Sequence, residues 1–273
     1  MDSEDSDIAP KTKRGLIVPV ANPEGVAPLL SIAFAAHEAD DPSVRVLALV
    51  RRATAAPGSA PLAAAPRSEA LIAASAYALA RGVAIEEQAV WSEDPAFDII
   101  TAAQDAESAW IVLGYHRASS GGGVMGGVVH EVLARAKALP INVGVFVQGT
   151  AHPFERVSAA FDSSPDGRAA LGLAVRIARG SKAKLRALLV SGRVEDTGDE
   201  LLDMVHDARG KLGRQFHSDV LGERSLKQLF KQTPGRLLIV GKSFADEVEM
   251  PLDEVPGEDR CVIVVQGGGA SNP

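Results

Sequence analysis

The sequence predicts an α/β fold in which parallel sheets are covered by helices on both faces. Short apolar runs alternate with segments of helical periodicity along the chain, and most of the runs are continuously apolar rather than alternating. Continuous apolar strands are typical of parallel sheets that are buried on both faces. The second half of the chain repeats the pattern of the first, so we expect two tandem copies of one α/β unit.

The first copy follows a polar segment, residues 1–14, that is expected to be disordered. Asp94 is the expected N-cap of its third helix, with Pro95 in the first turn. An Ala/Pro-rich linker follows the second strand. The expected strands of this copy are 15–20, 44–50, 83–90, 110–114 and 141–149. The expected helices are 26–39, with Pro28 tolerated only in its first turn, 67–82, 92–108 and 127–139.

The second copy is recognised by three correspondences with the first. The matching pairs of segments are 156–190 with 15–50, 236–243 with 110–117, and 261–268 with 143–150. The second copy is shorter where the first carries a glycine-rich loop. We therefore predict one domain over residues 15–150, a degenerate copy over 151–268 with a boundary near Thr150–Pro153, and a tail over 269–273.

Composition excludes several classes of function. The net charge is −7 and no dense basic stripe is present, which argues against a nucleic-acid partner. The single cysteine, Cys261, lies in an apolar run and indicates a small buried side chain rather than a disulfide framework. The histidines show no metal-ligand spacing, so no metal site is expected. No apolar stretch approaches the ~20 residues of a membrane span and no signal peptide opens the chain, so a cytoplasmic location is expected.

A glycine-rich loop is the strongest functional feature. An apolar strand ends at Gly114, glycines follow at 121–123 and at Gly126 and Gly127, and a helix begins at once. Glycines allow a ligand to approach the backbone, while free N–H groups and the helix dipole favour an anion. In parallel sheets, ligands bind beyond the carboxyl ends of the strands, where the segment after the first strand, residues 21–25, is the other candidate loop.

The spacing of this loop resembles a known family. Gly114, two residues, Arg117, nine residues and Gly127-Val128 are similar to the pattern G-x2-G-x9-G-[S/T] of universal stress protein domains. The resemblance implies two Rossmann-like (adenine nucleotide alpha hydrolase-like) domains, each a five-stranded parallel sheet of order 3-2-1-4-5, packed as a pseudo-two-fold pair. Arg117 replaces the middle glycine, Val128 replaces the hydroxyl residue, and Ala21 stands where nucleotide-binding members carry an acid.

The resemblance implies that ATP or AMP is held at the first-domain loop. The second domain keeps an acid, Asp162, after its first strand but lacks the loop, so binding is expected in the first domain. The residues that the resemblance assigns to the nucleotide site are Pro19, Ala21, Asn22, Val50, Leu113, Gly114, Arg117, Gly126, Gly127, Val128, Val129 and His130.

Two functional hypotheses follow. The first is a non-catalytic tandem universal stress protein that senses an adenine nucleotide, with the two fifth strands, 141–147 and 260–265, paired across an intrachain pseudo-two-fold axis or, alternatively, in a homodimer. The second is a cytosolic regulatory domain of a membrane transporter such as a cation–proton antiporter, because the first domain also looks like domains attached to such transporters and to amino-acid permeases. An enzyme is not expected, since no general base or metal-binding carboxylate accompanies the loop.

Overall fold

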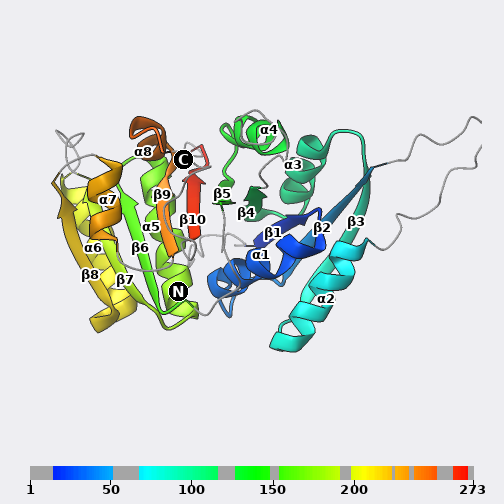
Figure 1. The fold of residues 1–273 in the computed structure, drawn as a ribbon, viewed down its shortest axis with the longest axis horizontal. Helices are drawn as coiled ribbons and strands as arrows, with labels where there is room; N and C mark the ends of the chain where they lie inside the picture. Colours follow the sequence, from blue (N-terminus) through cyan, green and yellow to red (C-terminus); the bar gives the residue numbers. More distant parts are fainter. Residues whose placement is uncertain are drawn as a thin grey trace, which may run out of the picture.

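The protein is a layered α/β molecule built on one continuous sheet (Figure 1). Strands and helices alternate along the chain, as the sequence predicts. The computed structural model describes residues 15–51, 68–115, 127–147, 154–190, 198–222, 225–233, 237–250 and 261–269. Within these ranges, no helix is both long and apolar enough to cross a membrane.

The first half contributes five strands and four helices. In chain order these are β1 (Gly15–Val20), α1 (Pro23–Ala36), β2 (Val44–Arg51), α2 (Glu69–Arg81), β3 (Ile85–Ser92), α3 (Pro95–Asp105), β4 (Ser108–Tyr115), α4 (Gly127–Ala136) and β5 (Asn142–Val147). The helix ends follow their sequence signals. The Ser68 side chain accepts a hydrogen bond from the Leu71 N–H at the start of α2. The Asp94 side chain accepts one from the Phe97 N–H at the start of α3, so the predicted N-cap at Asp94 is confirmed.

The second half repeats this series. Its elements are β6 (Arg156–Phe161), α5 (Pro165–Gly180), β7 (Lys184–Val190), α6 (Gly198–Leu212), a short 3-10 turn (Gly213–Gln215), β8 (Phe216–Leu221), α7 (Leu226–Gln232), β9 (Leu237–Gly241), α8 (Lys242–Glu247) and β10 (Cys261–Gln266). In this half α8 begins directly after β9, whereas in the first half the glycine-rich segment separates β4 from α4. Cys261 is buried, as predicted.

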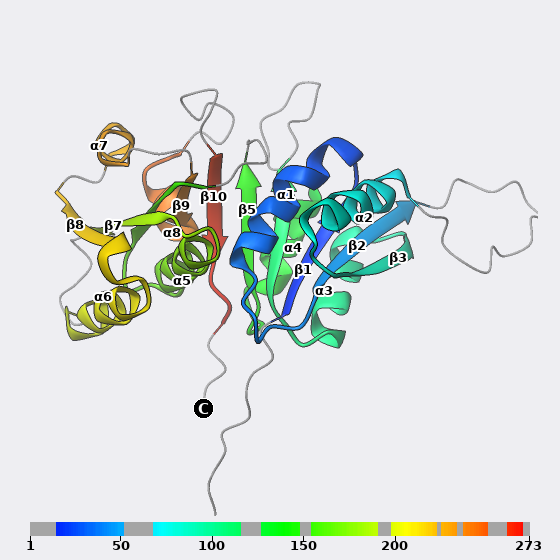
Figure 2. The same cartoon turned by 90° about the horizontal axis from the view of Figure 1, so that it is seen from below.

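The two halves form a single ten-stranded sheet of order β3-β2-β1-β4-β5-β10-β9-β6-β7-β8. Counted within each half, both copies have the predicted order 3-2-1-4-5, read from opposite edges of the sheet. All neighbouring strands are parallel except β5 and β10, which pair antiparallel with Val145 opposite Val264. Figure 2 shows these two strands side by side in the middle of the sheet. The predicted pseudo-two-fold pairing is therefore made through the fifth strands.

Each face of the sheet has its own core. Helices α1, α2, α5 and α6 cover one face and bury a cluster that includes Leu30, Leu173 and Ile177 (Figure 1). Helices α3, α4, α7 and α8 cover the other face over a second cluster that includes Ile99, Val132 and Phe244. Because both faces are covered, the inner strands such as β1, β9 and β10 are almost wholly buried, which explains the continuous apolar runs, whereas the edge strands β3 and β8 carry exposed polar residues.

Several expected helix boundaries are wrong: besides the two explained below, α1 ends at Ala36 rather than at residue 39, and α3 spans Pro95–Asp105 rather than 92–108. Helix α1 begins at Pro23 rather than at residue 26, because a proline suits the first helical position; this places Pro28 in the second turn, where the helix loses one backbone hydrogen bond. Helix α4 ends at Ala136 rather than at residue 139, ahead of Pro140. The expected lead-in 1–14, residues 52–66 of the linker, most of the glycine loop and the boundary Thr150–Pro153 lie outside the described residues.

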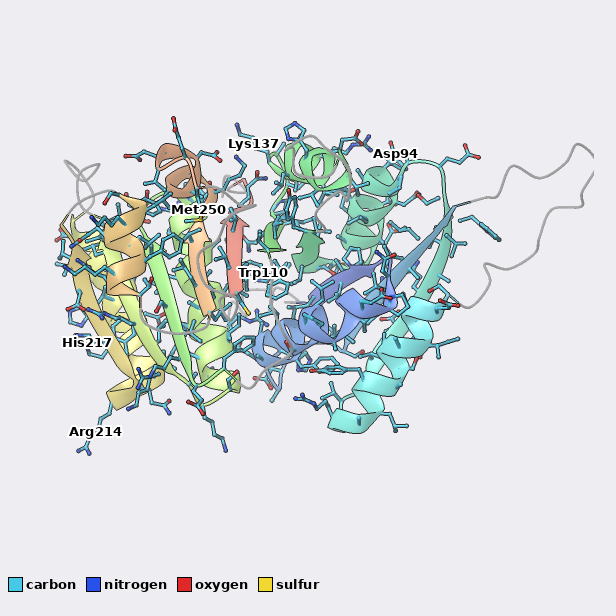
Figure 3. All side chains as sticks on the ribbon, in the orientation of Figure 1. Asp94, Trp110, Lys137, Arg214, His217 and Met250 are labelled. Carbon is cyan, nitrogen blue, oxygen red and sulfur yellow. The ribbon has the colours of Figure 1, made fainter. Side chains whose placement is uncertain are left out.

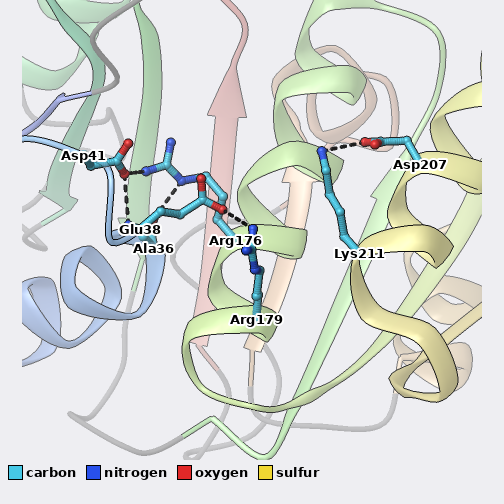
Figure 4. A network of polar contacts seen from close by, with 7 residues as sticks. All are labelled: Ala36, Glu38, Asp41, Arg176, Arg179, Asp207 and Lys211. Atoms are coloured by element: carbon cyan, nitrogen blue, oxygen red, sulfur yellow. Dashed lines mark hydrogen bonds and ion pairs between the residues drawn. The ribbon is translucent and has the colours of Figure 1, made fainter. Parts of the chain in front are cut away.

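A buried ion pair joins the halves on the α1/α5 face (Figure 4). Arg176 of α5 donates from Nε to the Ala36 carbonyl over 2.7 Å and pairs through its terminal nitrogen with the carboxylate of Asp41. Both side chains are buried, with exposed fractions of 10% and 4%. Beside them Arg179 pairs with Glu38 over 3.2 Å in a more exposed position. The end of α5 lies so close to α1 that a Cβ on Gly180 would stand 2.1 Å from the Ala35 carbonyl oxygen.

This interface is not symmetric in charge. The first half supplies carboxylates and the second half supplies guanidinium groups. Counted from the proline that opens each helix, the counterpart of Arg176 in α1 is Phe34, which instead stacks on Tyr77 of its own half at 6.0 Å. In a pair of two first halves, Asp41 of one copy would face Phe34 of the other, and its carboxylate would be buried without a cation. The charges therefore favour pairing between unlike halves.

Substitution of Arg176 by Met is expected to lower the free energy of unfolding by about 3–5 kcal/mol, because it leaves the Asp41 carboxylate buried without its partner. Arg179→Met is the matched control on the same helix, and loss of its exposed pair is expected to cost less than about 1 kcal/mol. Urea denaturation of the full chain measures both. Equal costs for the two variants would contradict the role assigned to the buried pair.

Candidate functional site

A cavity of about 300 Å³ opens at the carboxyl ends of the first-half strands. It lies where β1 has β2 on one side and β4 on the other, which is the point at which the strand order reverses. Such switch points are where open α/β sheets bind ligands. The lining comes from the ends of β1 to β4 and from the starts of α1, α3 and α4: Pro19, Val20, Ala21, Asn22, Gly25, Leu29, Leu49, Ser92, Pro95, Ile99, Leu113, Gly114, Gly127, Val128 and Val129.

Most of the residues that the sequence assigned to a site line this one cavity. They come from the end of β1, the end of β4 and the first turn of α4, which are far apart in the chain. The predicted residues that line the cavity are Pro19, Ala21, Asn22, Leu113, Gly114, Gly127, Val128 and Val129.

The remaining predicted residues lie elsewhere. Val50 follows the lining residue Leu49 on β2 but does not line the cavity itself. His130, one turn into α4, lines a different hollow between the halves, together with residues of α5, α8 and the end of β10. Arg117 and Gly126 fall in the stretch 116–126, outside the described residues.

Sequence reasoning missed the wall formed by β3 and α3. Ser92, Pro95 and Ile99 form this wall, and Leu49 of β2 and Leu29 of α1 are further lining residues that were missed. The available signal was positional: in a parallel sheet, the residues that follow every strand reach the same edge, so the turn after β3 belongs beside the turns after β1 and β4. The resemblance directed attention to the glycine loop and to the ends of β1 and β2, and not to the turn after β3.

The described lining has an apolar body and few polar groups. None of its side chains is ionisable, and Asn22 and Ser92 are its polar side chains. The backbone of Gly114, Gly127 and the first turn of α4 supplies the remaining polar groups. A Cβ placed on Gly127 would meet nothing within 4 Å, so the space beside this glycine is open.

The α3 and α4 walls of the cavity are tied together by Asp94. Its carboxylate caps α3 by accepting a hydrogen bond of 3.0 Å from the Phe97 N–H. It also accepts a hydrogen bond of 2.7 Å from the Arg135 guanidinium of α4. The Arg135 guanidinium also lies 5.9 Å from the centre of the Phe97 ring. The hydrogen bond from Phe97 and then that from Arg135 lower the pKa of Asp94. Figure 3 shows Asp94 beside α3 and α4, at the rim of the molecule.

The Asp94 contacts predict a pH-dependent stability. Because the folded state lowers this pKa below its usual 3.8, the contribution is present above that value and is lost as the pH falls through the folded-state pKa. Asp94→Asn keeps an N-cap oxygen but removes the charge, so we expect a lower melting temperature than wild type near pH 7 and a difference that shrinks as the pH falls below 3.8.

Thermal denaturation between pH 2 and 7 measures this effect. Glu93→Gln is the control, since it removes a charge from the adjacent exposed residue. A pH profile for Asp94→Asn that runs parallel to that of wild type would contradict the assignment.

The corresponding position in the second half is closed. The first turn of α5 packs on Gly241 at the end of β9, so that a Cβ there would lie 3.0 Å from the Gly167 nitrogen. The Asp166 carboxylate accepts from the Ser243 N–H and hydroxyl over 2.9 and 2.7 Å, and from the Gly267 N–H over 2.8 Å. In the second half these polar groups therefore hydrogen-bond to one another, at the position where the first half has its open cavity.

Asp162, the acid that the second copy retains, is also engaged internally. It is 5% exposed and its carboxylate accepts from the N–H and the hydroxyl of Ser164. Ser164 in turn caps α5 by accepting from the Gly167 N–H over 3.0 Å. The acid therefore holds the residue that caps the start of α5.

Comparison with known proteins identifies a family over the first half. Residues 14–139 match the model of the universal stress protein family. No match is found among curated proteins. The matched segment runs from the lead-in through α4 and contains the whole lining of the cavity.

Solved structures share the fold over nearly the whole chain. A universal stress protein from Archaeoglobus fulgidus is 17% identical with a TM-score of 0.52, covering 93% of this chain and 96% of its own. One from Pseudomonas aeruginosa, described as a putative universal stress protein, is 18% identical with a TM-score of 0.57 and 92% coverage of both chains. The cytoplasmic domain of a prokaryotic cation chloride cotransporter is 13% identical with a TM-score of 0.59, covering 95% of this chain and 98% of its own.

Proposed function

We propose that the universal stress protein domain detected over residues 14–139 binds an adenine nucleotide, ATP or AMP, in the cavity at the ends of β1 and β4. One observation carries the proposal. Residues from three separate segments, chosen from the sequence alone, line a single hollow at the switch point of the sheet. The chain would act as a sensor whose state depends on the bound nucleotide.

The arrangement suits the parts of a nucleotide. The apolar wall of Leu29, Leu49 and Ile99 can hold a flat ring by burial. Gly114 and Gly127 leave the backbone accessible to a phosphate, and the free N–H groups at the start of α4 favour an anion. Arg117 would add a cation that pairs well with phosphate oxygens.

Binding rather than catalysis is the activity we propose. The described lining contains no carboxylate, histidine, lysine or cysteine that could act as a general base or nucleophile. In the described ranges no cluster of three or more histidine, cysteine, aspartate or glutamate residues is arranged to hold a metal ion. The closed counterpart in the second half supports one nucleotide per chain, with the second copy acting as the fixed partner of the first.

Gly127→Val is expected to abolish binding while leaving the fold intact. The new side chain enters open space in the protein but occupies the position from which a phosphate would approach the backbone. For wild type, ATP or AMP at 100 times Kd should stabilise the folded state by about 2.7 kcal/mol, a rise in melting temperature of roughly 5–10 °C.

Thermal shift assays with millimolar ATP and AMP measure the effect. Gly172→Val is the matched control, because Gly172 lies on α5 with similarly open space around it and is remote from the cavity. Absence of a shift in wild type with any adenine nucleotide would remove nucleotide sensing from the proposal.

A second candidate function rests on one of the structural neighbours. The cytoplasmic domain of a cation chloride cotransporter has this fold over nearly its whole length, with both halves present. We propose as the alternative that the chain is a regulatory domain of a membrane transporter, joined to it covalently or encoded beside it. Nucleotide affinity would then be weak, in keeping with Ala21 and Val128 in place of polar residues.

Gene context separates the two candidates. On the transporter hypothesis, the natural reading frame continues into membrane-spanning segments of ~20 apolar residues, or a transporter gene lies beside it and its product co-purifies with this chain in detergent. A separate gene with no membrane protein nearby would exclude this alternative and favour a free sensor.

A further inference from the structure

Helix α2 is apolar on both of its faces. Its inner face packs on α1. The residues buried on that side are Ala70, Leu71, Ala74 and Ala78. Its outer face also carries apolar side chains, since Ile72 and Leu79 are 55% and 83% exposed and the alanines at 76 and 80 are exposed beside them. The outer face is therefore an apolar surface that no other element of the described chain covers.

The helix also lacks the charged residues that normally keep an outer face in water. Glu69 lies in its first turn and Arg81 in its last, and residues 70–80 between them contain no Asp, Glu, Lys or Arg. A surface helix normally turns a polar or charged face to water, whereas a helix that is apolar all round is normally buried. The composition of α2 thus indicates that a partner covers its outer face.

The corresponding helix of the second half has a charged outer face. Helix α6 connects the second and third strands of its half, as α2 does in the first. Its exposed Leu202 is surrounded by polar side chains that are also exposed, namely Asp199, Asp203 and His206. Because the same position in the fold accepts a charged surface, the apolar outer face of α2 is not a requirement of the fold.

The position of α2 decides how a second copy of the chain could approach. The helix lies beside β3, the edge strand of the sheet, at the end of the molecule away from the second half (Figures 1 and 2). Strand-to-strand association at this edge is disfavoured, because β3 exposes Glu86 and Glu87 and charges on edge strands oppose such pairing. The fifth strands already pair with each other within the chain. A second copy would therefore meet this end through the helix.

The charges at the two ends of α2 define the partner that fits it. A helix lying along this face must place a cation beside Glu69 and an anion beside Arg81, with apolar side chains between them. Helix α2 itself, followed in the opposite direction, has this order: Arg81, Leu79, Ala76, Ile72 and Glu69. The small side chain of Ala76 near the middle allows two helix backbones to approach closely. The face is thus complementary to a second copy of itself.

We propose that two copies of this chain associate through antiparallel α2 helices, related by a two-fold axis near Ala76. In such an interface Ile72 packs near the partner's Leu79, and Glu69 pairs with the partner's Arg81. The helix has 13 residues and is about 20 Å long, so the contact is smaller than the ~800 Å² per partner of a standard stable interface. The dimer therefore forms reversibly, with a Kd on the order of 1–100 µM.

Sedimentation velocity of the full chain over this concentration range tests the proposal. Leu79→Glu should raise the Kd of the dimer at least about tenfold, because each dimer buries two of these leucine side chains. Leu202→Glu is the matched control, since it makes the same change on the outer face of α6 and should leave the Kd unchanged. Both leucines are exposed in the single chain, so both variants should keep the melting temperature of the wild-type monomer.

A charge exchange tests the antiparallel arrangement. Glu69→Arg and Arg81→Glu should each weaken self-association, because each places like charges opposite one another at both ends of the interface. An equimolar mixture of the two variants should associate again, since one copy then supplies cations at both helix ends and the other supplies anions.

Three results would overturn the proposal. A chain that stays monomeric throughout the concentration range would assign the α2 face to a different protein or to another segment of the chain. A dimer that Leu79→Glu leaves unchanged would place the contact on another surface. A mixture of Glu69→Arg and Arg81→Glu that associates no more tightly than either variant alone would exclude the antiparallel pairing.

Discussion

The antiparallel pairing of β5 with β10 is the constraint on which the rest of the structure depends. Each half alone would end at a fifth strand whose apolar face and backbone groups need a partner, because an exposed flat edge is an aggregation hazard. Pairing the two edges turns two small sheets into one of ten strands. It also places α1 against α5, where Arg176 and Asp41 can meet only because the strands are joined.

The same duplication allowed the two halves to diverge. In the first half, the ends of β1 and β4 enclose an open cavity. In the second, Asp166 ties the first turn of α5 to Ser243 and Gly267, and α8 starts directly after β9. A carboxylate of the chain thus occupies donors that an external anion would otherwise need. The first half carries the open cavity, while the second contributes a strand edge, a helix face and two arginines.

The candidate site shows which of its residues could be predicted from motif spacing and which could not. Gly114, Gly127 and the residues after β1 could be assigned because their spacing reflects a strand–loop–helix unit, and they line one cavity. Ser92 and the α3 wall could not be assigned from spacing, because they enter through the sheet order, which brings β3 to the same edge two strands away from β1. His130 was grouped with the loop by proximity in sequence, but one helical turn directs it to the other side of α4.

The sequence by itself determined the local elements and the duplication. Apolar runs, caps such as Asp94 and the repeated pattern predict strands, helices and two copies, because these depend on short-range geometry and on burial on both faces of a sheet. Only the tertiary structure decided which charges meet and which copy stays open. Arg176 and Asp41, 135 residues apart in the chain, form a pair because two helices cross at the junction. The first cavity is open and the second is closed because a single helix turn packs on Gly241, a contact that follows from the final positions of β9 and α5 and leaves no periodic trace in the sequence.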